Sequence, residues 1–449
     1  MSSMRERMNR LRGSQGSSAI DEQSAQSENQ TVNMPEALSA NAAQETEAAS
    51  ALESPAQDVH EAVWQRLQVA ERSSKWGSFL QREVRYPLQY QHGHHLLAEL
   101  AETAEHLRVF HPEETGLPAP SLENLLFLDL ETTGLGAGTG NIPFMVGLGY
   151  VQNEQFVIAQ YLIRHPAEER AMLADLQTRM EDFHYLVTYN GRTFDWPVLA
   201  GRFIMNGLGR AELRLKHLDF LHPSRSIWRN TLASCKLSYV EEERLGIHRV
   251  DDVPGSQAPA IYFQFLADSN PSPLEGVFVH NELDMLAMAC LSIRFGRLLD
   301  NRISGEVYAP KKPEEWIRTG LWLERMGQAR QAEAIFHMVM EADPKGESSL
   351  MLLAARDKKV GNWERAVLLW QKVAMTAHVE FAAVYEAFIE LAMYYEHRAK
   401  QPETALTYAH GAQSAISERA LLQRADAKRR AEQAALTKRI ERLKRKLSR

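Results

Sequence analysis

The sequence is poor in cysteine and lacks long apolar runs. Only Cys235 and Cys290 occur among the 449 residues. Two isolated cysteines exclude a disulfide framework and a zinc cage, and they are typical of buried thiols in a reducing compartment. No apolar run approaches the length that crosses a bilayer, and no apolar segment follows the basic residues at the start, as a secretory signal would require. We therefore expect a cytoplasmic protein without a membrane segment.

The first part of the chain lacks the residues that build a hydrophobic core. Residues 13–58 contain no Lys, no Arg and no aromatic residue, and they are rich in Ser, Gln, Ala and Glu. Such a composition cannot bury enough apolar surface to offset chain entropy. We expect residues 1–60 to form a disordered acidic arm.

The formal net charge of −7 gives no sign of nucleic-acid binding, but its distribution does. From Arg419 to the end the chain has 12 Lys and Arg and 3 Asp and Glu. Such asymmetry often marks an interaction tail. An apolar stripe from Leu436 to Leu447 predicts that residues 418–449 form a basic helix. Its cations could contact phosphates, or the helix could simply cap the preceding domain.

The strongest chemical signal is the segment Phe127-Leu-Asp-Leu-Glu-Thr-Thr-Gly-Leu135. If it is a strand, Asp129 and Glu131 point to one face together with Phe127. Two acids on a buried strand are costly unless a cation compensates them, and hard oxygen ligands suit Mg²⁺ or Mn²⁺. The alternative is a solvated pair of acids at the end of a strand.

The surrounding pattern predicts an α/β fold. Strands are expected over 124–131, 143–151 and 155–163, with Asn153-Glu154 as the turn of an antiparallel hairpin. Helices over 167–182 and 194–206 then alternate with strands over 185–189 and 213–221. An antiparallel meander followed by alternating helices and strands describes a mixed sheet flanked by helices.

Three further residues fall where a carboxylate site would need them. Asp195 follows a strand at the start of a helix, where it could also act only as an N-cap. His280 and Asp284 are four residues apart at the opening of an apolar helix expected over 283–299, so they share a helical face. A histidine beside carboxylates is a candidate general base, although it could also be a capping or surface residue.

Other polar residues have simpler explanations. The spacing of His92, His94 and His95 matches no common zinc pattern, so we expect packing or surface roles for them. The additional acids in the region are expected to be structural. These are Asp219, Asp251 and Asp252.

The set of candidate residues resembles a known family. Asp129, Glu131, Asp195 and Asp284, with His280, resemble the site of the DEDD exonucleases in the ribonuclease H-like superfamily. The run Asp-Leu-Glu-Thr-Thr-Gly is similar to their first motif, and Asn190-Gly-Arg-Thr-Phe-Asp195 is similar to their second. The third motif resembles the histidine-bearing subtype, but the interval between His280 and Asp284 is that of the tyrosine-bearing subtype.

A closer resemblance is to a YprB-like branch, in which such an exonuclease domain is joined to tetratricopeptide repeats. The segments that carry it are Asp219–Trp228, Leu237–Ile247 and Arg249–Gly255. The resemblance implies a ribonuclease H-like fold and a 3′→5′ exonuclease that acts in DNA repair on DNA with a free 3′ end.

The resemblance also implies roles for the site residues. Two Mg²⁺ or Mn²⁺ ions would be bound, with Asp129 bridging them and Asp195 serving the second. Glu131 and Asp284 would hold the ion that activates water, and His280 would accept the proton of that water. The terminal nucleotide would lie against Thr132, Thr133, Gly134 and Asn190, with Tyr189 or Phe194 as stacking partners.

The C-terminal part contains an internal repeat. Residues 327–336 are similar to residues 361–370, and Ala332 and Ala366 are separated by 34 residues, the tetratricopeptide period. A third unit places Ala405 after 39 further residues. We expect an all-α tetratricopeptide-repeat solenoid over 313–417, with a plain helical bundle as the alternative. Such a solenoid implies a protein partner, and a helicase that exposes DNA ends would suit it.

These expectations divide the chain into an arm (1–60), introductory helices and a linker (61–120), the exonuclease domain (121–305), the repeats (313–417) and the basic helix (418–449). Two other functions remain open. The chain could be a catalytically idle scaffold whose repeats do the work. The same site could also belong to an RNA-directed or endonucleolytic enzyme.

Overall fold

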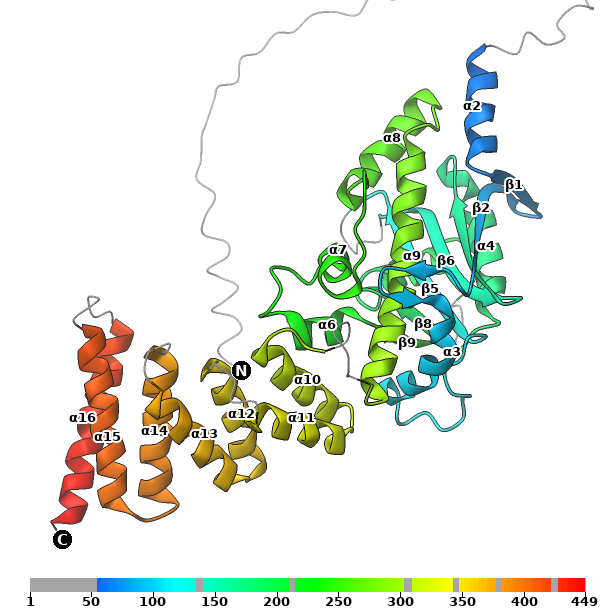
Figure 1. The fold of residues 1–449 in the computed structure, drawn as a ribbon. Coiled ribbons are helices and arrows are strands. Elements are labelled where there is room, and N and C mark those ends of the chain that lie inside the picture. Colours follow the sequence, from blue (N-terminus) through cyan, green and yellow to red (C-terminus); the bar gives the residue numbers. More distant parts are fainter. Residues whose placement is uncertain are drawn as a thin grey trace, which may run out of the picture. The chain divides into compact units, whose positions relative to one another are not determined.

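The computed structural model describes residues 55–134, 140–209, 215–302, 309–341, 347–376, 381–420 and 427–448. The chain divides into residues 1–53 and residues 54–449, and only the second unit is described below (Figure 1). The expected arm and the loop after Gly134 therefore lie largely outside the described residues.

A seven-stranded mixed sheet forms the centre of the fold. Its strand order is β1-β2-β7-β6-β5-β8-β9. The strands are β1 (Val69–Ser74), β2 (Gly77–Pro87), β5 (Leu125–Thr132), β6 (Pro143–Gln152), β7 (Gln155–Leu162), β8 (Tyr185–Thr188) and β9 (Lys216–Asp219). Neighbours from β1 to β5 are antiparallel, whereas β5, β8 and β9 are parallel. The predicted mixed sheet is confirmed.

The predicted hairpin is present between β6 and β7. Gln152 pairs with Gln155, and both turn residues, Asn153 and Glu154, have positive φ angles of 51° and 58°. Two consecutive residues with positive φ are the signature of a type I′ turn, whose twist matches that of the flanking strands.

The prediction of introductory helices and a linker over 61–120 was wrong in part. After α2 (Pro55–Arg66), residues 69–87 form β1 and β2, which extend the central sheet. The local sequence pattern does not predict β2 because this strand carries Arg82. The Arg82 guanidinium donates hydrogen bonds to Gln160 and Glu282, which are distant in the sequence. A small sheet of β3 (Gln91–His92) and β4 (His95–Leu96) follows.

Alternating residues of β5 pack into separate hydrophobic cores on the two faces of the sheet. Leu126, Leu128 and Leu130 share a core with α4 (Glu169–Met180), α5 (Asp195–Met205) and α8 (Ala258–Asp268). Leu125 and Phe127 face the core that contains most of α9 (Leu274–Leu299), together with α6 (Leu221–Trp228), α7 (Leu237–Val240) and η4 (Glu241–Leu245). Because side chains alternate along a strand, Asp129 and Glu131 lie on the α9 face.

The long helix α9 begins at Leu274, nine residues before the predicted start, so His280 lies inside it instead of at its opening. The buried residues Leu274, Val277 and Phe278 explain the earlier start, because they join the core on the other face. By length and composition α9 could cross a membrane, which the sequence analysis did not anticipate. However, 67% of its most apolar stretch is buried, as in the core helix of a folded domain.

The C-terminal region is helical. It contains α10 (Pro313–Arg325), α11 (Ala329–Glu341), α12 (Glu347–Val360), α13 (Trp363–Met375), α14 (Phe381–His397), α15 (Pro402–Ala420) and α16 (Ala427–Leu447). The turns inside the pairs α10–α11, α12–α13 and α14–α15 each contain a residue with positive φ, namely Gly327, Gly361 and Lys400. The basic helix α16 packs through Leu436 and Leu443.

A buried polar contact joins this helical region to the sheet domain. Glu315 of α10 is 1% exposed and accepts hydrogen bonds from Trp228 Nε1 at 2.9 Å and from Arg244 Nη2 at 2.9 Å. Because Arg244 is also buried, the pair fixes α10 against α6 and η4.

Candidate active site

The two acids of β5 lie beside other carboxylates; Glu131 is buried, and Asp129 is partly exposed. Asp129 Oδ2 accepts a hydrogen bond from Asn281 Nδ2 at 2.9 Å. Glu131 is 7% exposed, and no hydrogen bond to its carboxylate comes from the described residues. Burial raises the pKa of both groups well above the usual range, and the charges of Asp284 and Asp195 raise it further.

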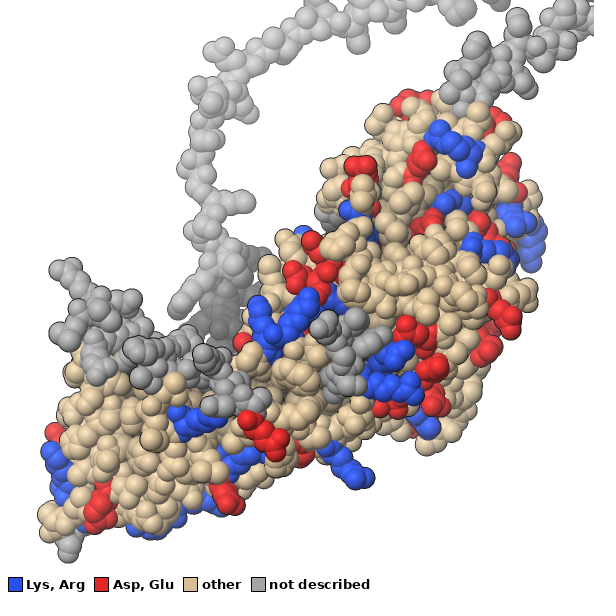
Figure 2. All heavy atoms as spheres, in the orientation of Figure 1, with Lys and Arg blue, Asp and Glu red and all other residues tan. Residues whose placement is uncertain are grey.

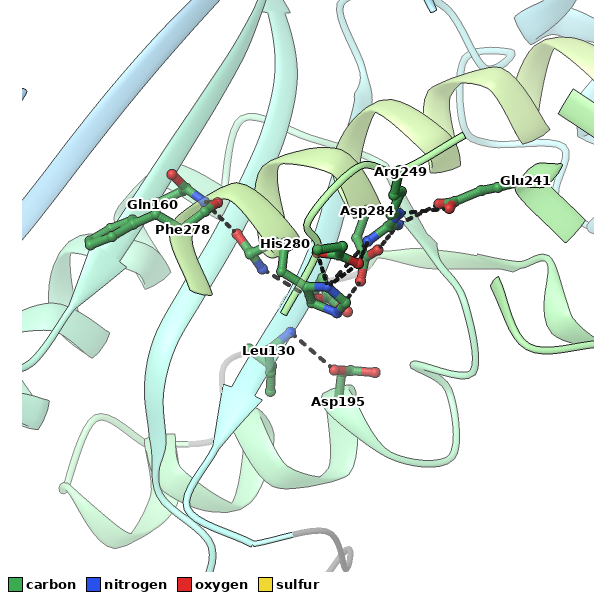
Figure 3. Close-up of polar contacts among 11 residues, drawn as sticks. Leu130, Gln160, Asp195, Glu241, Arg249, Phe278, His280 and Asp284 are labelled. Carbon is green, nitrogen blue, oxygen red and sulfur yellow. Dashed lines mark hydrogen bonds and ion pairs between the residues drawn. The ribbon is translucent and has the colours of Figure 1, made fainter. Parts of the chain in front are cut away.

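Asp195 is the first residue of α5 and is directed at β5. Its Oδ1 accepts a hydrogen bond from the backbone N–H of Leu130 at 3.2 Å (Figure 3). Burial raises its pKa to about 7, although hydrogen bonds from backbone N–H groups act in the opposite direction. Its contact with the neighbouring strand goes beyond the local N-cap role that the sequence left open.

Asp284 is paired with an arginine that the sequence analysis did not single out. Arg249 Nη2 forms an ion pair with Asp284 Oδ1, and the same guanidinium donates to Glu241 Oε2 at 2.7 Å and Asp252 Oδ2 at 3.1 Å (Figure 3). Burial raises the pKa of Glu241 to about 7 against the opposing effect of Arg249. One cation thus holds three carboxylates at the edge of the site.

His280 lies between two carboxylates. Its Nδ1 is 2.9 Å from both oxygens of Asp252, and its Nε2 is 3.7 Å from Asp284 Oδ2. Because a carboxylate accepts hydrogen bonds, we assign the proton to Nδ1, which leaves the lone pair on Nε2. Arg249 Nη1 also lies 3.2 Å from Nδ1. Asp252, for which a structural role was expected, contacts both His280 and Arg249 and so orients the candidate base.

Asn281 is held in place by its own partners. Gln160 Nε2 donates to Asn281 Oδ1 at 3.0 Å, which directs the Asn281 amide N–H toward Asp129. Both amide side chains are fully buried. On β6, a Cβ added to Gly147 would lie 2.2 Å from Asn281 Oδ1, so only glycine leaves room for this side chain. No local signal singled out Gln160 or Gly147 in the sequence.

The residues expected to contact substrate stabilise turns beside the acids. Thr132 Oγ1 donates to Gly134 O at 2.6 Å, and Ile142 N donates to Thr133 Oγ1 at 3.1 Å. Asn190 has a φ of 71°, and its side chain accepts from Thr193 Oγ1 at 2.8 Å.

The remaining candidates have packing or structural roles. Tyr189 is partly buried, and its hydroxyl donates to Cys235 O at 2.6 Å. Asp219 accepts from the backbone N–H groups of Asn190, Arg192 and Leu221, as its expected structural role requires. Burial lowers the pKa of His92 to about 4, consistent with the predicted packing role.

The donors fit a hard divalent cation only in part. Among the described residues, no group of three or more His, Cys, Asp or Glu is arranged as a ready metal cage. However, no donor among the described residues reaches the Glu131 carboxylate, and burial and the charges of Asp284 and Asp195 destabilise it as an anion. Oxygen ligands with uncompensated charge suit Mg²⁺ or Mn²⁺. Asp129, Glu131 and Asp195 are thus the fitting ligands, whereas one oxygen of Asp284, Oδ1, is already paired with Arg249.

Comparison with known proteins places this geometry in a family. Residues 126–295 match the family model described as RNase_H superfamily, whose members are commonly hydrolytic nucleases. The chain is also 34% identical over 371 residues to the uncharacterized protein YprB of Bacillus subtilis (strain 168). The aligned region covers 82% of this chain and 86% of YprB. The chain therefore belongs to the YprB family, with a domain of the RNase H superfamily over residues 126–295.

Proposed function

We propose that this protein is a metal-dependent 3′→5′ DNA exonuclease that acts in DNA repair in the cytoplasm. The observation that carries the proposal is the group of carboxylates Asp129, Glu131 and Asp195, the last two of them buried, beside the His280–Asp252 pair. Membership of the RNase H superfamily supports nuclease chemistry, and the resemblance of the motifs to DEDD exonucleases supports attack at a strand end.

Different residues of the site would bind the metal, accept the proton and orient the carboxylates. Mg²⁺ or Mn²⁺ held by Asp129, Glu131 and Asp195 would lower the pKa of water and stabilise charge on the leaving oxygen. His280 Nε2 accepts the proton of the attacking water, while Asp252 keeps the other ring nitrogen protonated and stabilises the resulting imidazolium. Asn281 fixes the orientation of Asp129 through the 2.9 Å hydrogen bond.

A single gel separates this function from its alternatives. The purified chain is given DNA and RNA strands with free or blocked 3′ ends, with Mg²⁺ or Mn²⁺ and with chelator. We expect stepwise shortening of DNA from a free 3′ end, which chelator stops. Cleavage of blocked strands would identify an endonuclease, preference for RNA would identify an RNA-directed enzyme, and no hydrolysis would favour the idle scaffold.

We also propose that α10–α15 are repeats of the tetratricopeptide kind that recruit a protein partner, such as a helicase that exposes 3′ ends. The support is the recurrence of a positive-φ residue in each helix pair and the full burial of Ala332, Ala366 and Ala405. A direct test is the dissociation constant of the full chain for a purified helicase. Binding that is no tighter than to an unrelated ATPase would refute this recruitment.

A further inference from the structure

A basic groove lies where α6 meets α10 and α12. Its volume is about 700 Å³. On the face drawn in Figure 2, Lys and Arg side chains gather over the region of α6. The charged residues that line the groove are six cations, Arg225, Arg229, Arg318, Arg325, Arg356 and Lys359, and one acid, Glu324.

Four of these cations are available to a ligand. Arg225, Arg229, Arg325 and Lys359 are exposed, and none of them forms an ion pair with a residue in the described part of the chain. By contrast, Arg356 binds Glu324, the one acid of the groove, at 3.1 Å. The groove therefore presents a surplus of positive charge that no described carboxylate neutralises.

The groove continues toward the carboxylates. A second cavity of about 330 Å³ shares His222, Ser226 and Arg325 with it and extends to Arg192. Arg192 is exposed and lies three residues before Asp195, in the loop that leads into α5. Asp219 also lines this cavity, but its carboxylate already accepts three backbone hydrogen bonds.

We propose that the two cavities form a track for the sugar–phosphate backbone of a single DNA strand whose end lies at the carboxylate cluster. Helices α10 and α12 then bind the substrate itself. This inference rests on the proposed nuclease function. Because Asp195 is only 5% exposed, we take the end of the strand to enter the site unpaired.

The chemistry of the lining favours a polyanion over an apolar peptide. In the larger groove only Leu321 and Val360 are apolar, whereas exposed Arg and Lys side chains match successive phosphates. Binding through phosphates is independent of sequence and depends steeply on salt. A strand long enough to extend from the carboxylate cluster into the groove gains affinity from the groove. A very short strand, which does not reach the groove, gains none.

The test measures binding without hydrolysis. Fluorescence anisotropy with chelator gives the affinity of the full chain for labelled DNA strands of about 4 and about 16 nucleotides, over a range of salt concentrations. Two variants alter opposite walls of the groove, Arg225→Ala/Arg229→Ala and Arg325→Ala/Lys359→Ala. The control, Arg330→Ala/Lys438→Ala, removes two exposed cations that line neither cavity. Thermal melting verifies that each variant is folded.

We expect both groove variants to bind the long strand roughly tenfold more weakly, with a salt slope shallower by about 0.7 per lost contact. The control and the short strand should be unaffected. Groove variants that bind the long strand as the control does would overturn the proposal. Hydrolysis is assayed separately with Mg²⁺. If hydrolysis is absent while this binding pattern is observed, the proposed nuclease function is refuted and the binding of DNA in the groove is supported.

Discussion

Asp195 shows at the scale of one residue why this site needs positive charge. The carboxyl is buried against β5, and its pKa rises from 3.8 to about 7. A carboxyl with a higher pKa in the folded state than in the unfolded state binds more protons when folded. Its contribution to stability is therefore greatest at low pH and is lost as the pH rises through about 7.

Replacement of Asp195 by Asn should flatten this dependence. In chelator, the wild-type protein should lose of the order of 2–4 kcal/mol more unfolding free energy than Asp195→Asn between pH 5 and pH 8. Urea denaturation at the two pH values measures the difference. Equal losses in both proteins would show that Asp195 is not a strained anion.

His280 and Asp252 form the second residue-scale unit. Because Asp252 keeps the proton on Nδ1, Asp252→Asn should lower kcat about 100-fold, in the range of a lost general base, while KM for DNA stays unchanged. Asp251→Asn is the matched control, since Asp251 is exposed and its positive φ suits Asn. The prediction fails if steady-state kinetics show equal kcat values for the two variants.

At the scale of elements, the packing of α9 on β6 and β7 positions Asp129. The contact depends on the absence of a side chain at Gly147 and on Gln160, which orients Asn281. The catalytic geometry is thus built partly by strands that carry no acid of the site.

A single methyl group tests this packing. Gly147→Ala must displace Asn281, so it should cost about 1–3 kcal/mol of unfolding free energy and reduce hydrolysis. Gly201→Ala, in α5 with open space around it, should be neutral or stabilising by up to about 1 kcal/mol. Urea denaturation and the gel assay compare the two variants. Gly147→Ala with wild-type stability and activity would contradict the positioning role.

The elements predictable from sequence are those with a local signal. The strand β5 and the β6–β7 hairpin follow from alternation and turn chemistry, and the observed ends differ from the predicted ones by about one residue. In contrast, β2 carries Arg82, whose charge predicts a surface position. Only the folded structure shows that Arg82 forms an ion pair with Glu282, which is distant in the sequence. The start of α9 was missed because its first two turns pack into a different core.

At the scale of the whole molecule, the sheet domain and the helical region meet at a buried ion pair between Arg244 and Glu315. Such a pair adds little stability compared with apolar residues, but loss of one partner leaves a charge buried without compensation. The relation of the groove to the carboxylates depends on this junction, because α10 contributes one of the groove walls.

Glu315→Ala should therefore destabilise the chain by about 3–5 kcal/mol. The adjacent Glu314, which is 26% exposed, is the control, and Glu314→Ala should change stability by less than about 1 kcal/mol. Chemical denaturation of the full chain distinguishes the two variants, and similar effects from both would show that the junction does not depend on Glu315.

The same scale explains which parts of the site were accessible from sequence. The spacing of Asp129, Glu131, Asp195 and Asp284 carries a recognisable pattern, and the fold brings these residues near one another. Arg249 and Asp252 act through charge pairing across elements, which no local spacing encodes. The ion pair of Asp284 with Arg249 was missed for this reason, since the sequence shows the acid without its cation.

The most direct test of the account is Mg²⁺-dependent hydrolysis of 5′-labelled single-stranded DNA with a free 3′ end by wild-type protein and by Asp129→Asn, with melting temperatures for both. We predict hydrolysis by the wild type that chelator abolishes, none by the variant, and a melting temperature for the variant at least as high as that of the wild type without metal. Hydrolysis by Asp129→Asn at the wild-type rate, or by the wild type in chelator, would contradict a carboxylate-held metal as the centre of the activity.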